Sequence, residues 1–418
     1  MRKGVTCSAT GGGAGLRRAA FGLPGRQQRD MIQVKAPGWR APISCLDPGQ
    51  SRHAFAPGDR AAGMVAPSHA QKERPNVAPI DARAPKAMTR RSFALVLLGL
   101  VLAALAVGLA YQRDLRAAKA RLSAAASIAE AAYGPVAFET GGAGAPVLAI
   151  HGAGGGHDQG RLLAEAFLPE GRRWIAPSRF GYPGSPLPDD PSTAAQADAF
   201  AELLDALGIE RVTLLAMSGG VPPALQFAIR HRARTEALIL LSLAPYAPLT
   251  DEEQELPVPL WLYDALFATD LPLWAVQRLA PRALAPVFDA LAEATARMNE
   301  AEAGFLDAMI AGFLPVTSRR AGLANEGAAI DPAAAIDPAA IDAPVLIVHA
   351  RDDRITPFPT ASFTAARIDG AEVLSFDTGG HLLLGHHDAV RRRIADFLAA
   401  NAGPRGVETR PLVQEPAR

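Results

Sequence analysis

The sequence predicts an α/β fold: a mostly parallel central sheet with helices on both of its faces. Three observations support this class. Short apolar runs recur over residues 133–400, they alternate with stretches of helical spacing, and most of the runs are nearly continuous in apolar residues. Strands that are apolar on both faces are typical of parallel sheets covered by helices on each side.

The runs that we interpret as buried strands are 145–152, 173–178, 212–218, 237–244, 343–350 and 371–377. Helical spacing is clearest in residues 192–208 and 388–401. Pro222 and Pro223 fall in the first turn of the helix expected after the third run, where a missing N–H costs little.

Between the fourth and fifth runs the alternation stops. We interpret residues of about 246–341 as a helical cap that lies over the strand ends, closed by a linker with the repeat AIDPAAAIDPAAIDAP. The insertion contains Trp261, Tyr263 and Trp274 among proline-broken helical pieces. Such aromatic side chains either line a pocket or pack on the sheet domain, and packing is the more frequent outcome.

The composition suits a large globular core and excludes several classes of function. Of the 418 residues, 49% are hydrophobic, and 42 basic side chains balance 42 acidic ones. Zero net charge gives no sign of a nucleic-acid partner. The two cysteines, Cys7 and Cys45, precede the body, which therefore has no disulfide framework, cysteine nucleophile or cysteine-ligated zinc.

The N-terminal part of the chain differs from the body. Residues 1–87 are rich in Gly, Pro, Arg and Ala without apolar periodicity, so we expect disorder there. Segment 88–111 contains Phe93–Ala110, an uncharged apolar run of 18 residues, at the lower limit for spanning a bilayer. We expect a linker helix over 112–132, and a tail at 401–418.

Three interpretations of the apolar run compete: a buried helix, a cleaved signal peptide with a site at Gly108–Ala110, and a retained anchor. A core helix seldom lacks polar residues over this length, and the run exceeds a typical signal, so we favour a single-pass anchor. Residues 89–93 also resemble a twin-arginine export signal. If translation starts at Met88, this signal stands at the N-terminus. With either start we expect the body of the chain to lie outside the cytoplasmic membrane.

Four chemical features follow four of the strands. His151 and a glycine-rich loop follow the first run, Ser218 the third, Asp352 and Asp353 the fifth, and His381 the sixth. Because the carboxyl ends of parallel strands meet at one edge of a sheet, we expect these residues to lie together. Each feature alone is weak, but four such features at the ends of four strands are much less expected by chance.

The stretch around Ser218 explains why a buried strand ends on a hydroxyl. A serine is a poor nucleophile until a base takes its proton, so its side chain must stand free on a sharp strand-to-helix turn. Small residues two before and two after the serine relieve crowding in that turn. Ala216 and Gly220 occupy these positions.

The body thereby resembles the α/β-hydrolase superfamily, whose nucleophile turn reads Gly-x-Ser-x-Gly and whose triad follows the chain order Ser, acid, His. The resemblance covers roughly residues 133–400 and includes His151-Gly152 and the segment PSRFGYPGSPLP. One departure is Ala216 in place of the first glycine. The resemblance implies a serine hydrolase that uses no metal or cofactor.

Residue by residue, the resemblance makes Ser218 the nucleophile, His381 the general base and Asp353 the acid that orients it. Asp352 is the rival acid and is otherwise a turn residue. His386 and His387 are rivals for the base, but they precede the last helix, and His157 is expected in a loop.

The oxyanion donors implied by the resemblance are the backbone N–H groups of Gly219 and Ala153. His151 is expected to brace its loop together with Gly152, and Gly154 to let the loop pass close to a substrate. The glycines do not predict a nucleotide site, because no lysine follows and no GxGxxG opens a helix.

We therefore predict an enzyme that hydrolyses an ester-like bond of a small or amphipathic molecule through an acyl-enzyme. A carbon–carbon hydrolase and a cofactor-free haloperoxidase-like enzyme are alternatives with the same residues. A ligand-binding protein that has lost turnover is the alternative of another class. The sequence does not indicate the substrate or the oligomeric state.

Overall fold

The apolar runs form one sheet in the computed structural model, which describes residues 89–244, 265, 268–326 and 336–402. The predictions for residues 1–87, for a start at Met88, for Trp261 and Tyr263, and for most of the tail lie outside the described residues. Within them the sheet has eight strands in the order β1-β2-β4-β3-β5-β6-β7-β8.

The strands β3 to β8 correspond to the six predicted runs, and all neighbours from β4 to β8 are parallel. Their bounds, with those of two further strands, are β1 (Ser127–Ala131), β2 (Gly134–Gly142), β3 (Ala145–Ile150), β4 (Arg172–Pro177), β5 (Val212–Met217), β6 (Thr235–Leu241), β7 (Val345–Ala350) and β8 (Glu372–Phe376).

The helix predicted over 112–132 is wrong in its last part, which forms the strand β1. Helix α1 (Arg90–Ala125) is continuous through the apolar run but ends at Ala125, and residues 127–131 form β1 instead of more helix. β1 pairs with β2, and β2 pairs with β4. The sheet therefore begins before residue 133. The sequence did not indicate β1 because this strand is short and only partly buried, and so gives little apolar signal.

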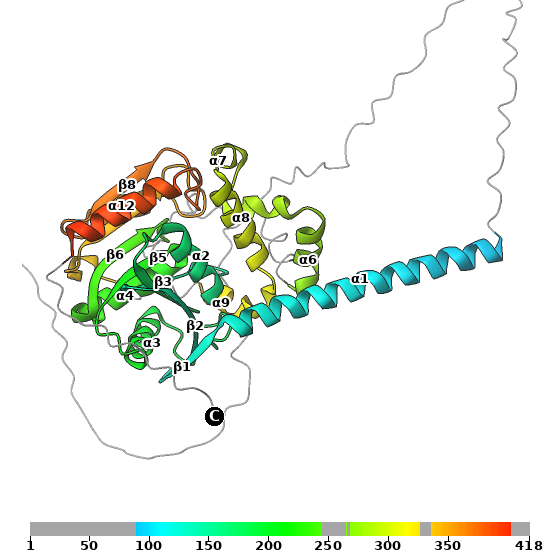
Figure 1. Cartoon of the computed structure of the whole chain (residues 1–418), viewed down its shortest axis with the longest axis horizontal. Helices are drawn as coiled ribbons and strands as arrows, with labels where there is room; N and C mark the ends of the chain where they lie inside the picture. The colour runs from blue at the N-terminus through cyan, green and yellow to red at the C-terminus, as the bar shows by residue number, and fades with distance from the viewer. Residues whose placement is uncertain (1–88, 245–264, 266–267, 327–335, 403–418) are drawn as a thin grey trace, which may run out of the picture. The chain divides into compact units, whose positions relative to one another are not determined.

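Helices cover both faces of the sheet, as the two core clusters show (Figure 1). α2 (His157–Phe167) and α12 (His387–Ala400) pack with Val147 and Leu215, whereas α3 (Thr193–Ala206), α4 (Val221–Arg230) and α11 (Phe358–Ala365) pack with Leu148 and Leu214. Neighbouring residues of one strand therefore point into the two cores on opposite faces of the sheet, which explains the almost continuous apolar runs.

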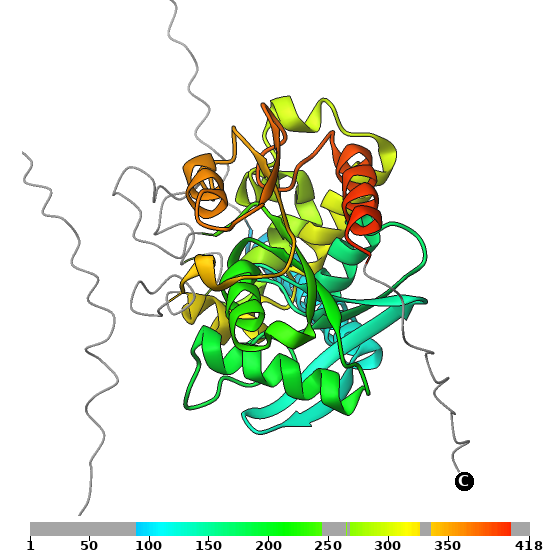
Figure 2. The same ribbon diagram turned by 90° about the vertical axis from the view of Figure 1, so that its left-hand side faces the viewer.

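The predicted helical cap is present over its described part, between β6 and β7. Figure 2 shows this yellow-green segment beside the orange and red C-terminal elements. Its helices are α6 (Asp270–Leu279), η4 (Pro281–Phe288), α7 (Ala292–Thr295), α8 (Glu300–Gly312), η5 (Val316–Ser318), α9 (Arg320–Ala324) and η6 (Pro338–Ala340). Leu306, Ile310 and Val316 join the core on the α2 side.

Helix α1 has two parts with different environments. In its apolar part the side chains are exposed, and within the described residues it is the one helix long and apolar enough to cross a membrane. In its C-terminal part Leu115, Ala118 and Leu122 are buried at helical spacing. Trp274 of α6 stacks edge-on against Tyr111 and donates to Asp114 at 3.0 Å. This cap aromatic therefore packs on α1.

Replacement of Leu148 by Ala should show how strongly the two-sided core holds the sheet. Leu148 is fully buried in β3, so Leu148→Ala is expected to lower the free energy of unfolding by about 2–5 kcal/mol. Chemical denaturation followed by circular dichroism measures this. Leu187→Ala is the matched control, because Leu187 is 42% exposed, and its change should stay within about 0.5 kcal/mol. Equal losses for both would contradict the assigned core.

Candidate active site

The end of β5 has the geometry of a nucleophile turn. Ser218 adopts φ 53°, a left-handed conformation that is uncommon and costly for a residue with a side chain. The residues from Ser218 to Gly220 form one 3-10 turn before α4 begins at Val221. A Cβ atom at Gly220 would lie 2.6 Å from the carbonyl oxygen of His151, so only glycine fits there. Ala216 is accommodated with no exposed surface.

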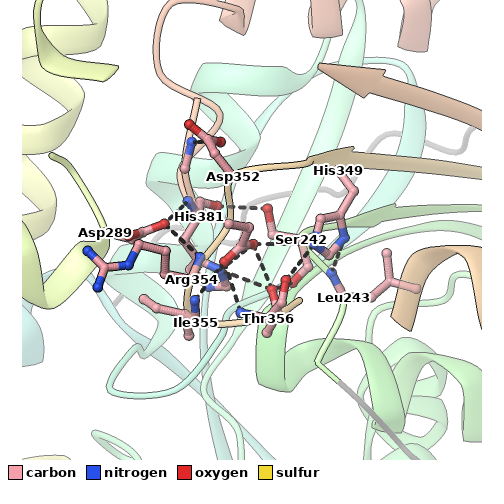
Figure 3. A network of polar contacts seen from close by, with 11 residues as sticks. Ser242, Leu243, Asp289, His349, Asp352, Arg354, Ile355, Thr356 and His381 are labelled. Atoms are coloured by element: carbon pink, nitrogen blue, oxygen red, sulfur yellow. Dashed lines mark hydrogen bonds and ion pairs between the residues drawn. The ribbon is translucent and has the colours of Figure 1, made fainter. Parts of the chain in front are cut away.

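His381 stands in the loop after β8, and several groups fix its backbone. Gly379 and Gly380 donate to the carboxylate of Asp352 at 3.2 and 2.9 Å. The hydroxyl of Ser242 donates to the carbonyl of His381 at 2.7 Å (Figure 3). Asp352 therefore holds the histidine loop in place and does not contact the ring itself.

Asp353 contacts the imidazole ring of His381. Nδ1 of the ring lies 2.9 Å from Oδ2 and 3.2 Å from Oδ1 of this carboxylate. Asp353 also accepts hydrogen bonds from the N–H groups of Ile355 and Thr356 and from the Thr356 hydroxyl. With Nδ1 held by the carboxylate, Nε2 is the ring nitrogen left to exchange a proton with a substrate or a nucleophile.

The two charges shift each other's protonation. Burial lowers the pKa of His381, but the charge and hydrogen bond of Asp353 outweigh this effect and the pKa is raised. Burial raises the pKa of Asp353, but the positive charge of His381 and its hydrogen bond outweigh it and the pKa is lowered. The site thus favours an ionised carboxylate and stabilises the cationic ring.

One short segment after β6 joins Ser218 to His381. Ala244 donates its N–H to the carbonyl of Ser218 at 3.4 Å, and Ser242, two residues earlier, bonds the carbonyl of His381. Ser242 has φ 43°, which turns the chain at this point. The serine turn and the histidine loop are therefore attached to the same three residues, and both side chains are buried.

Asp289, a cap residue, belongs to this site although no sequence pattern indicated it. Its Oδ2 accepts the backbone N–H groups of His381 and Arg354 at 3.2 and 3.0 Å (Figure 3). Its Oδ1 is buried without a partner among the described residues. Burial raises the pKa of Asp289 to about 6. The cap therefore holds the histidine loop directly, through a residue in an irregular stretch that no motif marks.

The glycine-rich loop lies against the serine turn. A Cβ atom at Gly152 would be 3.0 Å from Cβ of Ser218 and 3.2 Å from the carbonyl oxygen of Met217, so the loop backbone at Gly152 lies against the turn that presents Ser218. Gly154 has φ 70° and donates to the Tyr182 hydroxyl at 3.1 Å. Two backbone segments thus converge beside Ser218, an arrangement suited to binding an oxyanion.

His151 is fully buried beneath this loop. Nε2 accepts the N–H of Arg179 at 3.0 Å, so Nδ1 carries the proton and donates to the carbonyl of Gly152 at 2.7 Å. Burial, with the charge of Arg179, holds the pKa of His151 well below its usual value. The residue is a neutral brace of the loop.

Of the histidines other than His381, His349 comes near Asp353, with Nε2 3.4 Å from Oδ2, whereas the three rival histidines named in the sequence have other partners. The loop predicted for His157 is wrong, because this residue begins α2 and is buried against Glu139 at 2.6 Å. His386 stacks on Phe376, and His387 bonds the carbonyl of Leu382 at 3.0 Å. Among the described residues, no group of three or more His, Cys, Asp or Glu side chains could hold a metal ion.

A second cluster beside Ser218 was also not predicted. Arg179 and Tyr182 follow β4 and bind the carboxylate of Glu326, from the segment after α9. Arg179 lies in the segment PSRFGYPGSPLP, which indicates the family but no role for this arginine. Glu326 is about 150 residues later, so no local spacing could connect the two.

Comparison with known proteins identifies relatives that are named as hydrolases. The chain is 32% identical over 270 residues to 2-hydroxymuconate semialdehyde hydrolase of Pseudomonas sp. strain CF600, covering 62% of this chain and 88% of that protein. A solved alpha/beta hydrolase fold protein from Nakamurella multipartita is 30% identical with a TM-score of 0.57, covering 66% of this chain and all of the other.

A thermophilic esterase from Thermogutta terrifontis matches with a TM-score of 0.50 and 24% identity, over 66% of this chain and 98% of the esterase, which shows the shared fold alone. The family model described as alpha/beta hydrolase fold matches residues 145–388, more than half of the sequence. The chain therefore belongs to the alpha/beta hydrolase fold family.

Proposed function

We propose that this hydrolase cleaves an ester-like bond through an acyl-enzyme on Ser218. The contact between His381 and Asp353 supports the proposal most, together with the segment after β6 that bonds both the serine turn and the histidine loop. His381 takes the hydroxyl proton as Oγ attacks the carbonyl carbon, and the N–H groups of Gly219 and Ala153 stabilise the resulting oxyanion.

The intermediate then collapses in the usual order of acyl transfer. The C–O bond to the leaving group breaks as His381 returns its proton to that oxygen, which releases an alcohol and leaves the acyl group on Ser218. Water, deprotonated by His381, attacks this ester, and the acid departs as Ser218 recovers its proton. Asp353 stabilises the cationic ring in both halves. Every group in this cycle is a protein group or water.

A carbon–carbon hydrolase is the second candidate. The relative from Pseudomonas named 2-hydroxymuconate semialdehyde hydrolase supports it, and the same nucleophile, base and oxyanion donors would serve. Assays of 2-hydroxymuconate semialdehyde beside a panel of p-nitrophenyl esters graded by acyl length separate the two. Turnover of the semialdehyde far above that of every ester would favour carbon–carbon cleavage.

We also propose that α1 anchors the enzyme in a membrane, with the catalytic domain on the extracytoplasmic side. The exposed apolar part of the helix supports this location. The buried residues Leu115, Ala118 and Leu122 imply that the end of the helix is fixed to the catalytic domain. Substrates partitioned at the membrane surface would then be within reach of the enzyme.

Replacing the nucleophile or the base should abolish turnover. Ser218→Ala and His381→Ala are each expected to lower kcat by about 10⁶-fold, with little further loss in the double variant, because the two side chains act as one unit. Steady-state kinetics measure this, and a fluorophosphonate probe should label the wild type but not Ser218→Ala. A folded wild-type protein that remains unlabelled would indicate a binding protein instead.

The Asp353→Asn variant should lower kcat by about 10⁴-fold, since the ring loses its orienting anion. The base must be neutral to act, so wild-type kcat/KM is expected to fall as pH drops through the raised pKa of His381. Without the carboxylate that pKa decreases, and the acid limb moves to lower pH. Asp352→Asn is the control, and the acid limb of its kcat/KM profile should stay near the wild-type position. A shift of that limb equal to the shift in Asp353→Asn would contradict the assignment of Asp353.

Fractionation should test the anchor. The full chain is expected to stay in the membrane pellet after carbonate washing, because about 18 apolar residues suffice to span the hydrocarbon core. A variant that lacks residues 1–110 but keeps Tyr111 and the buried residues of α1 should be soluble and retain esterase activity. Release of the full chain by carbonate would argue against a membrane-spanning helix.

A further inference from the structure

Arg179 and Tyr182 form a receptor for a carboxylate group. Nη1 and Nη2 of Arg179 bind the two oxygens of Glu326 at 2.9 and 3.2 Å, in the fork geometry that suits a carboxylate. The Tyr182 hydroxyl donates to one of the same oxygens. Both receptor side chains are buried, and both stand in the loop after β4, on the sheet domain.

The occupant of the receptor comes from another part of the molecule. Glu326 follows α9, in the segment between β6 and β7, and its side chain is 20% exposed against 5% for Arg179. Nε of Arg179 is buried and has no partner among the described residues. The receptor is therefore the fixed and enclosed half of the pair, and Glu326 is the half that reaches solvent.

The receptor lies directly beside the serine turn. A Cβ atom at Gly219 would overlap the carboxylate of Glu326 and come within 3.2 Å of Nη1 of Arg179. Any larger residue at 219 would thus exclude the carboxylate, and the glycine leaves the space for it. Tyr182 also accepts the N–H of Gly154, which connects the receptor to the glycine-rich loop.

Charge balance explains how the site could exchange its occupant. A buried guanidinium without a counter-ion is strongly unfavourable, so Arg179 needs an anion at all times. Burial lowers the pKa of Arg179, but Glu326 outweighs this and raises it, so the guanidinium stays charged. An incoming carboxylate can replace Glu326 without a net change of buried charge, whereas a neutral group cannot.

We propose that Arg179 and Tyr182 bind a carboxylate group of the substrate, and that Glu326 fills this subsite when no such substrate is present. The proposal rests on the serine hydrolase function above and specifies its substrate class. That class is acyl compounds with a carboxylate a few bonds from the scissile carbonyl, such as half-esters of short dicarboxylic acids.

Two measurements on the full chain test the subsite. The first is protection of Ser218 from a fluorophosphonate probe by glutarate, with the uncharged glutaramide as the matched compound. The second is the ratio of kcat/KM for monomethyl glutarate to that for its amide, methyl 4-carbamoylbutanoate. Glutarate is expected to protect Ser218 of the wild type from labelling, whereas glutaramide is not. The ratio of the two kcat/KM values should exceed one, because the half-ester carries the carboxylate.

Variants assign the effect to the receptor. Arg179→Gln should remove protection by glutarate and lower the ratio at least about tenfold, since a hydrogen bond to a charged group is lost. Glu326→Gln removes the competing carboxylate and should lower the half-protecting glutarate concentration severalfold. Arg230→Gln is the matched control, because Arg230 forms a similar fork with Asp198 at the far end of α4 and should keep the wild-type ratio.

Some outcomes would overturn the subsite and leave the enzyme class intact. One such outcome is that Ser218 is labelled but glutarate and glutaramide protect it equally. Another is that the ratio of kcat/KM values is unchanged in Arg179→Gln. Either result would show that the ion pair of Arg179 and Glu326 only joins the cap to the sheet domain. If Arg179→Gln does not fold, an unaltered glutarate response in Glu326→Gln would overturn the subsite in the same way. Absence of labelling in the wild type would instead refute the serine hydrolase function itself.

Discussion

The contact between the Asp353 carboxylate and the His381 ring is the interaction on which the site depends, and it exists only because β7 and β8 end side by side. Each partner is held by groups other than the pair. Thr356 and the adjacent backbone fix the carboxylate, while Asp352, Ser242 and Asp289 fix the histidine loop. Because these restraints come from several strand ends and the cap, the dyad is preorganised before any substrate arrives.

The segment between β6 and β7 is part of the site as well as a cover for it. Asp289 bonds the histidine loop, and fully buried Arg319 donates to the carbonyl of Gly155 and pairs with Asp158. Glu326 occupies the receptor beside Gly219. Each of these three charged side chains binds groups of the sheet domain. A shift of the cap would therefore change contacts at the serine turn, the histidine loop and the glycine-rich loop together.

Helix α1 connects two environments without a break. Its apolar part is exposed, and within about one turn after it Tyr111 and Asp114 contact Trp274 of α6. If the apolar part crosses a bilayer, α6 lies close to the membrane surface, because an α-helix rises only about 1.5 Å per residue. The cap would then be the part of the enzyme that first meets amphipathic molecules.

The sequence by itself determined the parallel sheet, the six strands from β3 to β8, and the turn at Ser218, since each depends on local patterns of apolar, small and glycine residues. It also placed Asp353 and His381 after the correct strands, but could not choose Asp353 over Asp352 except by resemblance. Only the tertiary structure showed the β1–β2 hairpin, Asp289 on the histidine loop, and Glu326 in the fork of Arg179. The hairpin is local, but β1 is short and only partly buried and so gives little apolar signal. The contacts of Asp289 and Glu326 join residues 92 and 147 positions apart, and their energies arise from burial and charge pairing across elements, which leave no periodic trace along the chain.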